Sequence, residues 1–285
     1  MIADAQTNYV YFSELLRINE KYRAFSLELT ALLDTYDIRY GFLENTQDIW
    51  CRDYMPVQVD NGQFVEYRYD PDYLQAVKYR HLKTYPDMVC EAMGLKTTKT
   101  NIILDGGNVI RSENRVILTD KIFKENKAIY SKNELLAELR RLFKVKDVII
   151  IPWDKESEEY GHADGMIRFI DEDHVLINAY FREYSSSFQD KLYGVLDEAG
   201  IHLTEINFNV DKPDEEFNWA YVNFLQLGDL IIVPKIGIAE DSQALEQIRT
   251  AFPVYASMNR VVDIDVTPIL EDGGALNCIS WNIIS

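Results

Sequence analysis

A single cysteine near the end of the chain, Cys278, follows the glycine pair Gly273-Gly274. A thiolate is a strong nucleophile, and glycines allow a close approach of the backbone. Three distant segments carry side chains that could assist it: Trp50-Cys51-Arg52-Asp53, Asp105-Gly106-Gly107-Asn108 and Gly161-His162-Ala163-Asp164. A histidine can move protons, and carboxylates can hold a positively charged group while it is attacked. This combination of residue types predicts chemistry that breaks a guanidinium group.

Four residues are expected to carry the reaction: Cys278, His162, Asp53 and Asp164. Cys278 would be the nucleophile. His162 and Asp164 alternate along the chain, so in a strand their side chains would face the same way, as suits a proton carrier beside a carboxylate that grips the substrate. Asp53 follows Trp50, and we interpret the pair as a carboxylate that holds the cation beside an aromatic wall.

Further candidates for substrate binding are Asp105, Asn108, Asn223 and Gly274. The glycines after Asp105 could serve only a tight turn, and Asn223 could be a packed polar group of a strand. We interpret Cys51, Cys90, His174 and His202 as structural. No second His or Cys lies at ligand spacing from His162, so we expect no metal and no cofactor.

The composition limits the partners of the chain. Its 285 residues are 47% hydrophobic and 27% charged, as in a globular protein with a core. The formal net charge of −18 disfavours nucleic acid and favours a cationic substrate, although acidity that only maintains solubility explains it equally well. Three cysteines without a CxxC pair argue against a disulfide framework. The start lacks a signal peptide, and no apolar run approaches the ~20 residues of a membrane span, so we expect a cytoplasmic, reduced protein without membrane contact.

A β-rich run, a polar turn and a second β-rich run recur along the chain. The turns lie at Asn61, Asn114, Asp173 and Gly228, about 55 residues apart. Amphipathic helices are expected over 20–36, 134–143, 187–199 and 242–251, followed by strands over 38–42, 148–151, 201–206 and 261–266. The unit is ββαβ, and no Gly/Ser/Pro-rich linker separates the units. We therefore expect one domain over residues 1–285 with closed internal symmetry.

The candidate residues occupy one recurring place in this unit. Asp53, Asp105 and Asp164 each precede the first strand of a hairpin, and Asn223 and Cys278 hold the matching place in the last two units. Equivalent positions of repeats arranged around an axis converge on that axis. The repeat therefore predicts that these remote residues meet in one site. The acidic run 154–159, just before His162, is interpreted as a solvated loop.

At these residues the chain resembles the guanidine-modifying superfamily, and within it the agmatine deiminase and bacterial-type peptidylarginine deiminase family. The family's WxRDxxP is matched by Trp50, Arg52, Asp53 and Pro56, its [ED]GG by Asp105, Gly106 and Gly107, its GHxD by Gly161, His162 and Asp164, its Asn-containing strand entry by Tyr221-Val222-Asn223-Phe224, and its GGxxxC by Gly273, Gly274 and Cys278. The N-terminus and the residues around Cys278 depart from the agmatine deiminase pattern. The resemblance therefore supports the reaction, deimination, more firmly than it supports agmatine as the substrate of that reaction.

The resemblance implies an α/β fold, the five-bladed α/β propeller called the pentein, built from ββαβ repeats with pseudo-fivefold symmetry. It implies hydrolysis of a small cationic guanidino compound, agmatine or a related arginine derivative, to a ureido product and ammonia through a covalent amidino-thioether. Cys278 would be the nucleophile, His162 the general acid/base, and Asp53 and Asp164 the guanidinium clamps. Alternatives are a peptidylarginine deiminase, an amidinotransferase, a dimethylarginine hydrolase or a non-catalytic pentein binding protein. Family analogy suggests a homo-oligomer.

Overall fold

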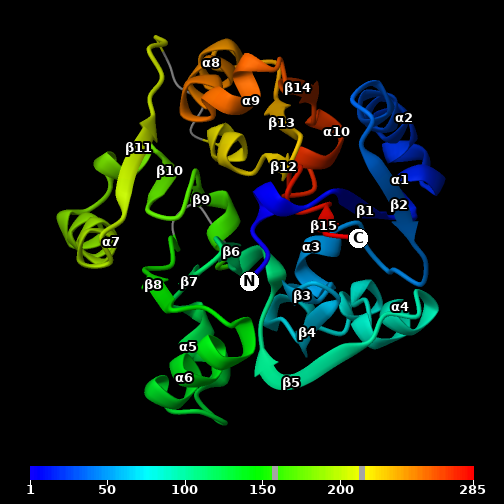
Figure 1. Cartoon of the computed structure of the whole chain (residues 1–285), viewed down its shortest axis with the longest axis vertical. Coiled ribbons are helices and arrows are strands. Elements are labelled where there is room, and N and C mark those ends of the chain that lie inside the picture. Colours follow the sequence, from blue (N-terminus) through cyan, green and yellow to red (C-terminus); the bar gives the residue numbers. More distant parts are fainter. Residues whose placement is uncertain (156–159, 212–215) are drawn as a thin grey trace.

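The described part of the chain has a mixed α/β fold with small sheets. A computed structural model describes residues 1–155, 160–211 and 216–285, so most of the acidic run 154–159 lies outside the described residues. The described residues form five sheets of three strands each. In Figure 1 these sheets lie around a common centre, with the larger helices on the outside.

The five sheets share one strand order. An antiparallel hairpin supplies the first two strands, and the third pairs in parallel with the second. Four sheets are contiguous in sequence: β3 (Val57–Asp60), β4 (Gln63–Arg68) and β5 (Thr97–Ile103); β6 (Ile110–Arg111), β7 (Arg115–Thr119) and β8 (Asp147–Ile151); β9 (Ile167–Phe169), β10 (His174–Asn178) and β11 (His202–Ile206); β12 (Leu225–Leu227), β13 (Leu230–Lys235) and β14 (Val261–Asp265). The middle strands read as apolar runs because they are buried on both faces, as Val116, Ile117 and Leu118 are.

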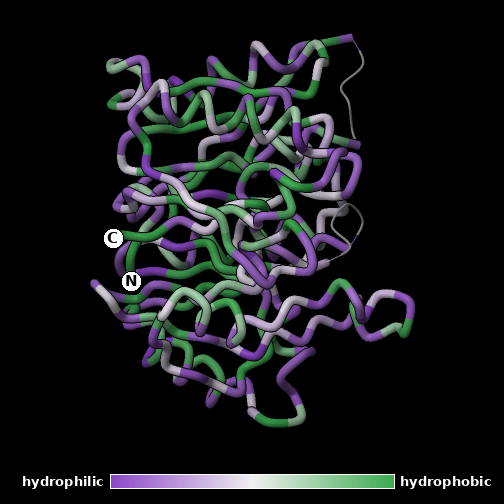
Figure 2. Tube along the Cα trace, turned by 90° about the vertical axis from the view of Figure 1, so that its right-hand side faces the viewer, coloured by the Kyte–Doolittle hydropathy of each residue, from purple (hydrophilic) through white to green (hydrophobic). Residues whose placement is uncertain are grey.

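The two ends of the chain form the fifth sheet together. β15 (Trp281–Ile283) pairs antiparallel with β1 (Tyr9–Ser13), which pairs in parallel with β2 (Arg39–Leu43). The N- and C-termini accordingly lie close to each other in both views (Figures 1 and 2). The fifth unit is therefore completed by a strand from the N-terminus, which ties the first residues of the chain to the segment that carries Cys278.

Helices connect the second and third strands of each sheet. They are α1 (Leu15–Ile18) and α2 (Glu20–Thr35), α4 (Pro86–Ala92), α5 (Lys121–Asn126) and α6 (Lys132–Phe143), α7 (Ser186–Glu198), and α8 (Asp241–Ala251) and α9 (Pro253–Ser257); α3 (Cys51–Tyr54) and α10 (Thr267–Leu270) lie between units. Local signals set their ends. Ser131 and Glu134 form a capping box at the start of α6, and Lys144 ends that helix in the left-handed conformation. The predicted helices and third strands are confirmed, with ends that differ by about two residues or fewer.

His162, Ala163 and Asp164 do not lie in a strand, so the alternation considered for their side chains does not apply, and Asp164 precedes the first strand of its hairpin as expected. His162 caps a short 3-10 helix, Ala163–Gly165, and the strand β9 begins only at Ile167. The same local shape recurs at the matching places: Asp53 lies within the single-turn helix α3, and Asp105 caps the 3-10 helix Gly106–Asn108. A period of two therefore does not apply to these side chains. The described helices include none long and apolar enough to cross a membrane.

Candidate active site

A cavity of about 420 Å³ brings together side chains from remote parts of the chain. Four of the sequence-predicted residues line it: Trp50, Asp53, His162 and Cys278. The other described lining residues are Asp48, Tyr69, Tyr73, Leu74, Tyr79, Leu82, Tyr160, Asp272 and Gly273. The thiol, the imidazole and a carboxylate thus face one space, with aromatic side chains forming much of its wall.

His162 lies between two carboxylates. Its Nδ1 is 3.7 Å from Asp53 Oδ1, and its Nε2 is 3.1 Å from Asp105 Oδ2. The Gly107 N–H donates a hydrogen bond of 2.9 Å to Asp53 Oδ1, which fixes that carboxylate against the imidazole. A Cβ on Gly107 would stand 2.7 Å from Asp53 Oδ1 and 2.8 Å from His162 Nδ1. The glycines after Asp105 therefore do more than form a turn, because they allow the backbone to contact the site.

Cys278 is held by the loop that precedes β15 and by Asn223. The Asn223 Oδ1 accepts hydrogen bonds from the backbone N–H groups of Asn277, at 3.0 Å, and Cys278, at 3.3 Å. The Cys278 Sγ lies 3.4 Å from the same oxygen and 3.6 Å from Asp164 Oδ2. Asn223 and Asp164 thus lie beside the thiol, and neither belongs to the described lining of the cavity.

The acidic surroundings oppose ionisation of the thiol. Burial raises the pKa of Cys278 well above its ordinary value, and the nearby carboxylates of Asp164 and Asp53 raise it further. Burial also raises the pKa of Asp53 to about 7, with Asp105 and Asp164 adding to the rise and His162 opposing it. The empty site therefore favours a neutral thiol, and a cation bound between the carboxylates would stabilise the thiolate.

Two sequence candidates have other partners. Asn108 Oδ1 accepts a hydrogen bond of 2.8 Å from the Thr119 N–H and does not belong to the described lining, so it braces the turn after Asp105. Gly274 packs against the indole of Trp50. Cys51 donates to the Ile279 carbonyl at 2.8 Å, away from the cavity lining.

Sequence reasoning missed three residues at the site. Lys121 is buried, with its ammonium 3.4 Å from Asp105 Oδ2 and 3.3 Å from Glu125 Oε1, so it supplies positive charge behind the His162–Asp105 pair. Asp48 also lines the cavity, and its position two residues before Trp50 was a signal in the sequence that could have identified it. Asn277 donates to Asp164 Oδ2 at 2.7 Å and adjoins Cys278. Nothing in the pattern distinguishes Lys121 from a surface lysine at the start of a helix.

Gly274→Ala is expected to lower the turnover of any reaction that uses Cys278 by about 10²-fold, the effect of misplacing a reacting group by about 1 Å. A Cβ at this position would lie 2.6 Å from the Cη2 atom of Trp50, so either the indole or the Cys278 loop must shift. The matched control is Gly194→Ala in α7, where a Cβ meets nothing within 4 Å. Steady-state kinetics of both variants tests this; equal activity would show that the contact with Trp50 does not position the thiol.

Together, a thiol, an imidazole and carboxylates line one cavity of a mixed α/β fold, and these are the groups that thiol-dependent enzymes use. Among the described residues, no group of three or more His, Cys, Asp or Glu side chains is arranged to hold a metal ion. The chain belongs to the Porphyromonas-type peptidyl-arginine deiminase family, whose sequence profile matches residues 6–283.

Individual proteins agree with this family membership. The chain is 24% identical to a putative agmatine deiminase of Enterococcus faecalis, over 67% of this chain and 60% of that protein. It is 22% identical to a putative agmatine deiminase of Selenomonas ruminantium, over 84% of this chain and 74% of that protein. The chain thus spans less than two thirds of the first relative's length. The structure of the C. jejuni agmatine deiminase shares the fold, with a TM-score of 0.75 and 17% identity over 100% of this chain and 95% of that one.

Proposed function

We propose that this protein is a cysteine-dependent deiminase that hydrolyses a guanidino compound, agmatine first among them, to the ureido product and ammonia. The observation that carries the proposal is the presence of Cys278, His162 and Asp53 on one cavity, with Asp164 and Asp105 in contact behind them. Membership of the Porphyromonas-type peptidyl-arginine deiminase family and the names of the curated relatives support the same reaction.

The first half of the reaction forms a bond between Cys278 and the substrate. Asp53 and Asp164 accept hydrogen bonds from the guanidinium nitrogens, a charge-assisted match for a planar cation. The cation lowers the cost of ionising the buried thiol, which releases its proton to solvent, and the thiolate Sγ attacks the central carbon. His162 delivers a proton to the departing nitrogen, which leaves as ammonia, and the enzyme holds an amidino-thioether.

The second half uses water and returns the thiol. His162, now neutral, removes a proton from a water molecule as that water attacks the same carbon. The carbon–sulfur bond then breaks and the hydroxyl proton of the adduct passes to the sulfur, which releases the ureido product and restores the Cys278 thiol beside the protonated imidazole. Asp105 accepts from His162 Nε2 at 3.1 Å and so directs Nδ1 toward the cavity, while Lys121 supports the charge of Asp105.

The charge of the described cavity lining bears on the choice of substrate. This lining includes the carboxyl groups of Asp48 and Asp272 and several tyrosines, with no lysine or arginine among the described lining residues. Asp272 already pairs with Lys21 at 2.7 Å, so it is the missing cation that discriminates between substrates: one with a terminal carboxylate, such as free arginine, would find no positive group among these residues to pair with, whereas agmatine, which has no carboxylate, needs none. The charged groups of the described lining therefore support agmatine over arginine as the substrate.

The architecture we propose is the five-bladed α/β propeller, the pentein, with pseudo-fivefold symmetry in a single domain over residues 1–285. Five sheets with the same strand order, arranged around a centre and closed by the two termini, support it (Figure 1). A thiol nucleophile needs a reducing compartment, so we propose that the enzyme acts in the cytoplasm. Family analogy suggests that it is a homo-oligomer.

An ammonia-release screen tests the function directly. Purified protein is incubated with agmatine, arginine, a peptidylarginine and methylated arginines, and both ammonia and the ureido product are measured. The expected result is turnover with agmatine as the best substrate. Turnover of a methylated arginine or a peptidylarginine in preference to agmatine would assign a different member of the same class. Release of ammonia from none of these compounds would contradict the proposal.

A further inference from the structure

Five equivalent positions on the first strands of the sheets are polar and buried. Each is the residue paired with the second strand near the middle of the hairpin, and they are Gln58, Arg111, Arg168, Gln226 and Asn282. Inward-facing positions of a strand in a core are normally apolar, so this polar set marks the centre of the fold as a distinct environment. A third buried guanidinium, from Arg52 on α3, joins the two strand arginines there.

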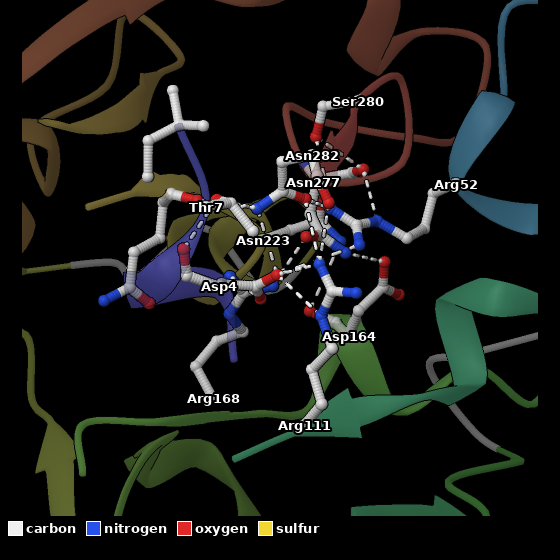
Figure 3. Close-up of polar contacts among 12 residues, drawn as sticks. Asp4, Thr7, Arg52, Arg111, Asp164, Arg168, Asn223, Asn277, Ser280 and Asn282 are labelled. Atoms are coloured by element: carbon white, nitrogen blue, oxygen red, sulfur yellow. Dashed lines mark hydrogen bonds and ion pairs between the residues drawn. The ribbon is translucent and has the colours of Figure 1, made fainter. Parts of the chain in front are cut away.

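One carboxylate, Asp4, faces all three guanidiniums (Figure 3). Its oxygens lie 2.7 Å from Arg111, 3.0 Å from Arg168 and 3.9 Å from Arg52. Burial alone would raise the pKa of Asp4, but the three guanidiniums hold it well below its ordinary range. Asp4 is the first residue of the 3-10 helix Asp4–Gln6, which lies at this centre (Figure 3). It also accepts a hydrogen bond of 3.1 Å from the side-chain amide of Asn282.

A continuous series of contacts runs from Asp4 to the thiol. The Arg168 guanidinium bonded to Asp4 also donates to Asn277 Oδ1, at 2.6 Å. The amide nitrogen of Asn277 donates to Asp164 Oδ2, at 2.7 Å, and that oxygen lies 3.6 Å from the Cys278 Sγ. Because a primary amide accepts at one end and donates at the other, the guanidinium fixes which end of Asn277 faces Asp164.

We propose that Asp4 is a positioning residue for the reaction, because it holds Arg168 so that Asp164 stays free to face the thiol and the substrate. The inference rests on the proposed function for the role of Asp164. Asp4 is absent from the described lining of the cavity, so it acts through its partners, and Arg168 is the partner that contacts the Asn277 side chain.

The charge of the centre explains why this restraint is needed. Three guanidiniums share the carboxylate of Asp4, and the next carboxylate toward the site is Asp164, one amide away from Arg168. A buried guanidinium that loses its partner carries a large desolvation cost and takes the nearest carboxylate it can reach. Without Asp4, Arg168 would compete with the substrate cation for Asp164, and Asp164 would turn away from the thiol.

Two variants test the proposal. The first variant, Asp4→Asn, removes the carboxylate. The second combines Asp4→Asn with Arg111→Met, which removes one negative and one positive group and so leaves the net buried charge unchanged. It serves as the test if the single variant folds poorly. Both lose the Asp4–Arg168 ion pair. In both we expect KM for agmatine to rise by about tenfold, within the usual range of coupling between sites, with a smaller change in kcat. Asp60→Asn, which loses an exposed ion pair to Lys144, is the matched control.

A second readout does not depend on turnover. Iodoacetamide labelling followed by mass spectrometry reports each cysteine separately, and withdrawal of Asp164 is expected to speed labelling of Cys278 while Cys51 and Cys90 stay protected. Unchanged KM and unchanged labelling would overturn the inference, as would equal acceleration at all three cysteines, which indicates lost packing. If the unaltered protein releases no ammonia from any guanidine, the proposed function fails, and the selective labelling still decides the role of Asp4.

Discussion

Cys278→Ala is expected to abolish ammonia release, with a loss in kcat on the order of 10⁴-fold or more, as found when a covalent nucleophile is removed. Without Sγ the amidino-thioether cannot form, and direct attack by water on a resonance-stabilised guanidinium must replace it. The described lining of the cavity contains no other thiol. A rapid assay of ammonia with agmatine, at protein concentrations high enough to detect the residual rate, measures the loss.

The fold of this variant should be intact, because alanine fits where a cysteine side chain stood and, although the Sγ contacts with Asn223 and Asp164 are lost, the two backbone hydrogen bonds to Asn223 Oδ1 remain. Cys90→Ala is the matched control: Cys90 is buried in α4 and outside the described lining, so its loss should leave turnover unchanged. Substantial turnover by Cys278→Ala would assign the nucleophile elsewhere. The inactive variant also provides a form of the site that binds substrate without consuming it.

The repeat accounts for most of what the sequence predicted. The apolar runs of β7, β10 and β13 and the amphipathic pattern of α6 carry a strong period, so their positions followed from the residues. The short helical turns at Asp53, Asp105 and His162 were not predicted as helical, because a single turn is too short to show a periodic pattern. The roles assigned to the site residues remain predictions that the variants described here can test.

Contacts between side chains that are far apart in the sequence could not be predicted from its local patterns. Lys121 opens α5 with the residue type of an exposed helix end, yet its ammonium is buried against Asp105. Asp4 lies in a segment that departs from the family's usual N-terminus, yet it pairs with Arg111 and Arg168. Both are long-range ion pairs whose partners only the assembled sheets define. Tertiary geometry, and not local pattern, decides where a charge is buried.

Binding of agmatine to the Cys278→Ala variant is expected to weaken by about tenfold for each pH unit below about 7, because a single protonation then competes with the cation. Burial raises the pKa of Asp53 to about 7, so below that pH the carboxyl group is neutral and cannot pair with a guanidinium. The guanidinium itself stays charged throughout this range, so the titration belongs to the protein. Calorimetric titration between pH 5.5 and 8.5 measures the slope.

The raised pKa of Asp53 also affects the stability of the Cys278→Ala variant without agmatine. This stability is expected to fall as the pH rises, whereas agmatine binding strengthens. The pKa of Asp53 is about 7 in the folded state against 3.8 as the ordinary value, so the folded state binds more protons between these limits. Its contribution to the free energy of unfolding is therefore full below about pH 4 and is lost as the pH rises through about 7. Thermal unfolding of Cys278→Ala should show the melting temperature falling over this window without agmatine, while the increment that agmatine adds grows.

Asp53→Asn in the Cys278→Ala background separates this group from its neighbours. An amide cannot ionise, so agmatine binding should lose its break near pH 7 and be weaker at pH 8 by roughly 10- to 100-fold, the value of a charge-assisted hydrogen bond. Asp48, whose pKa burial raises to about 8, also lines the cavity, and Asp48→Asn should keep the break near pH 7. If agmatine binds equally well at pH 5.5 and 8, or if Asp53→Asn leaves the pH dependence unchanged, then Asp53 is not the carboxylate that holds the cation.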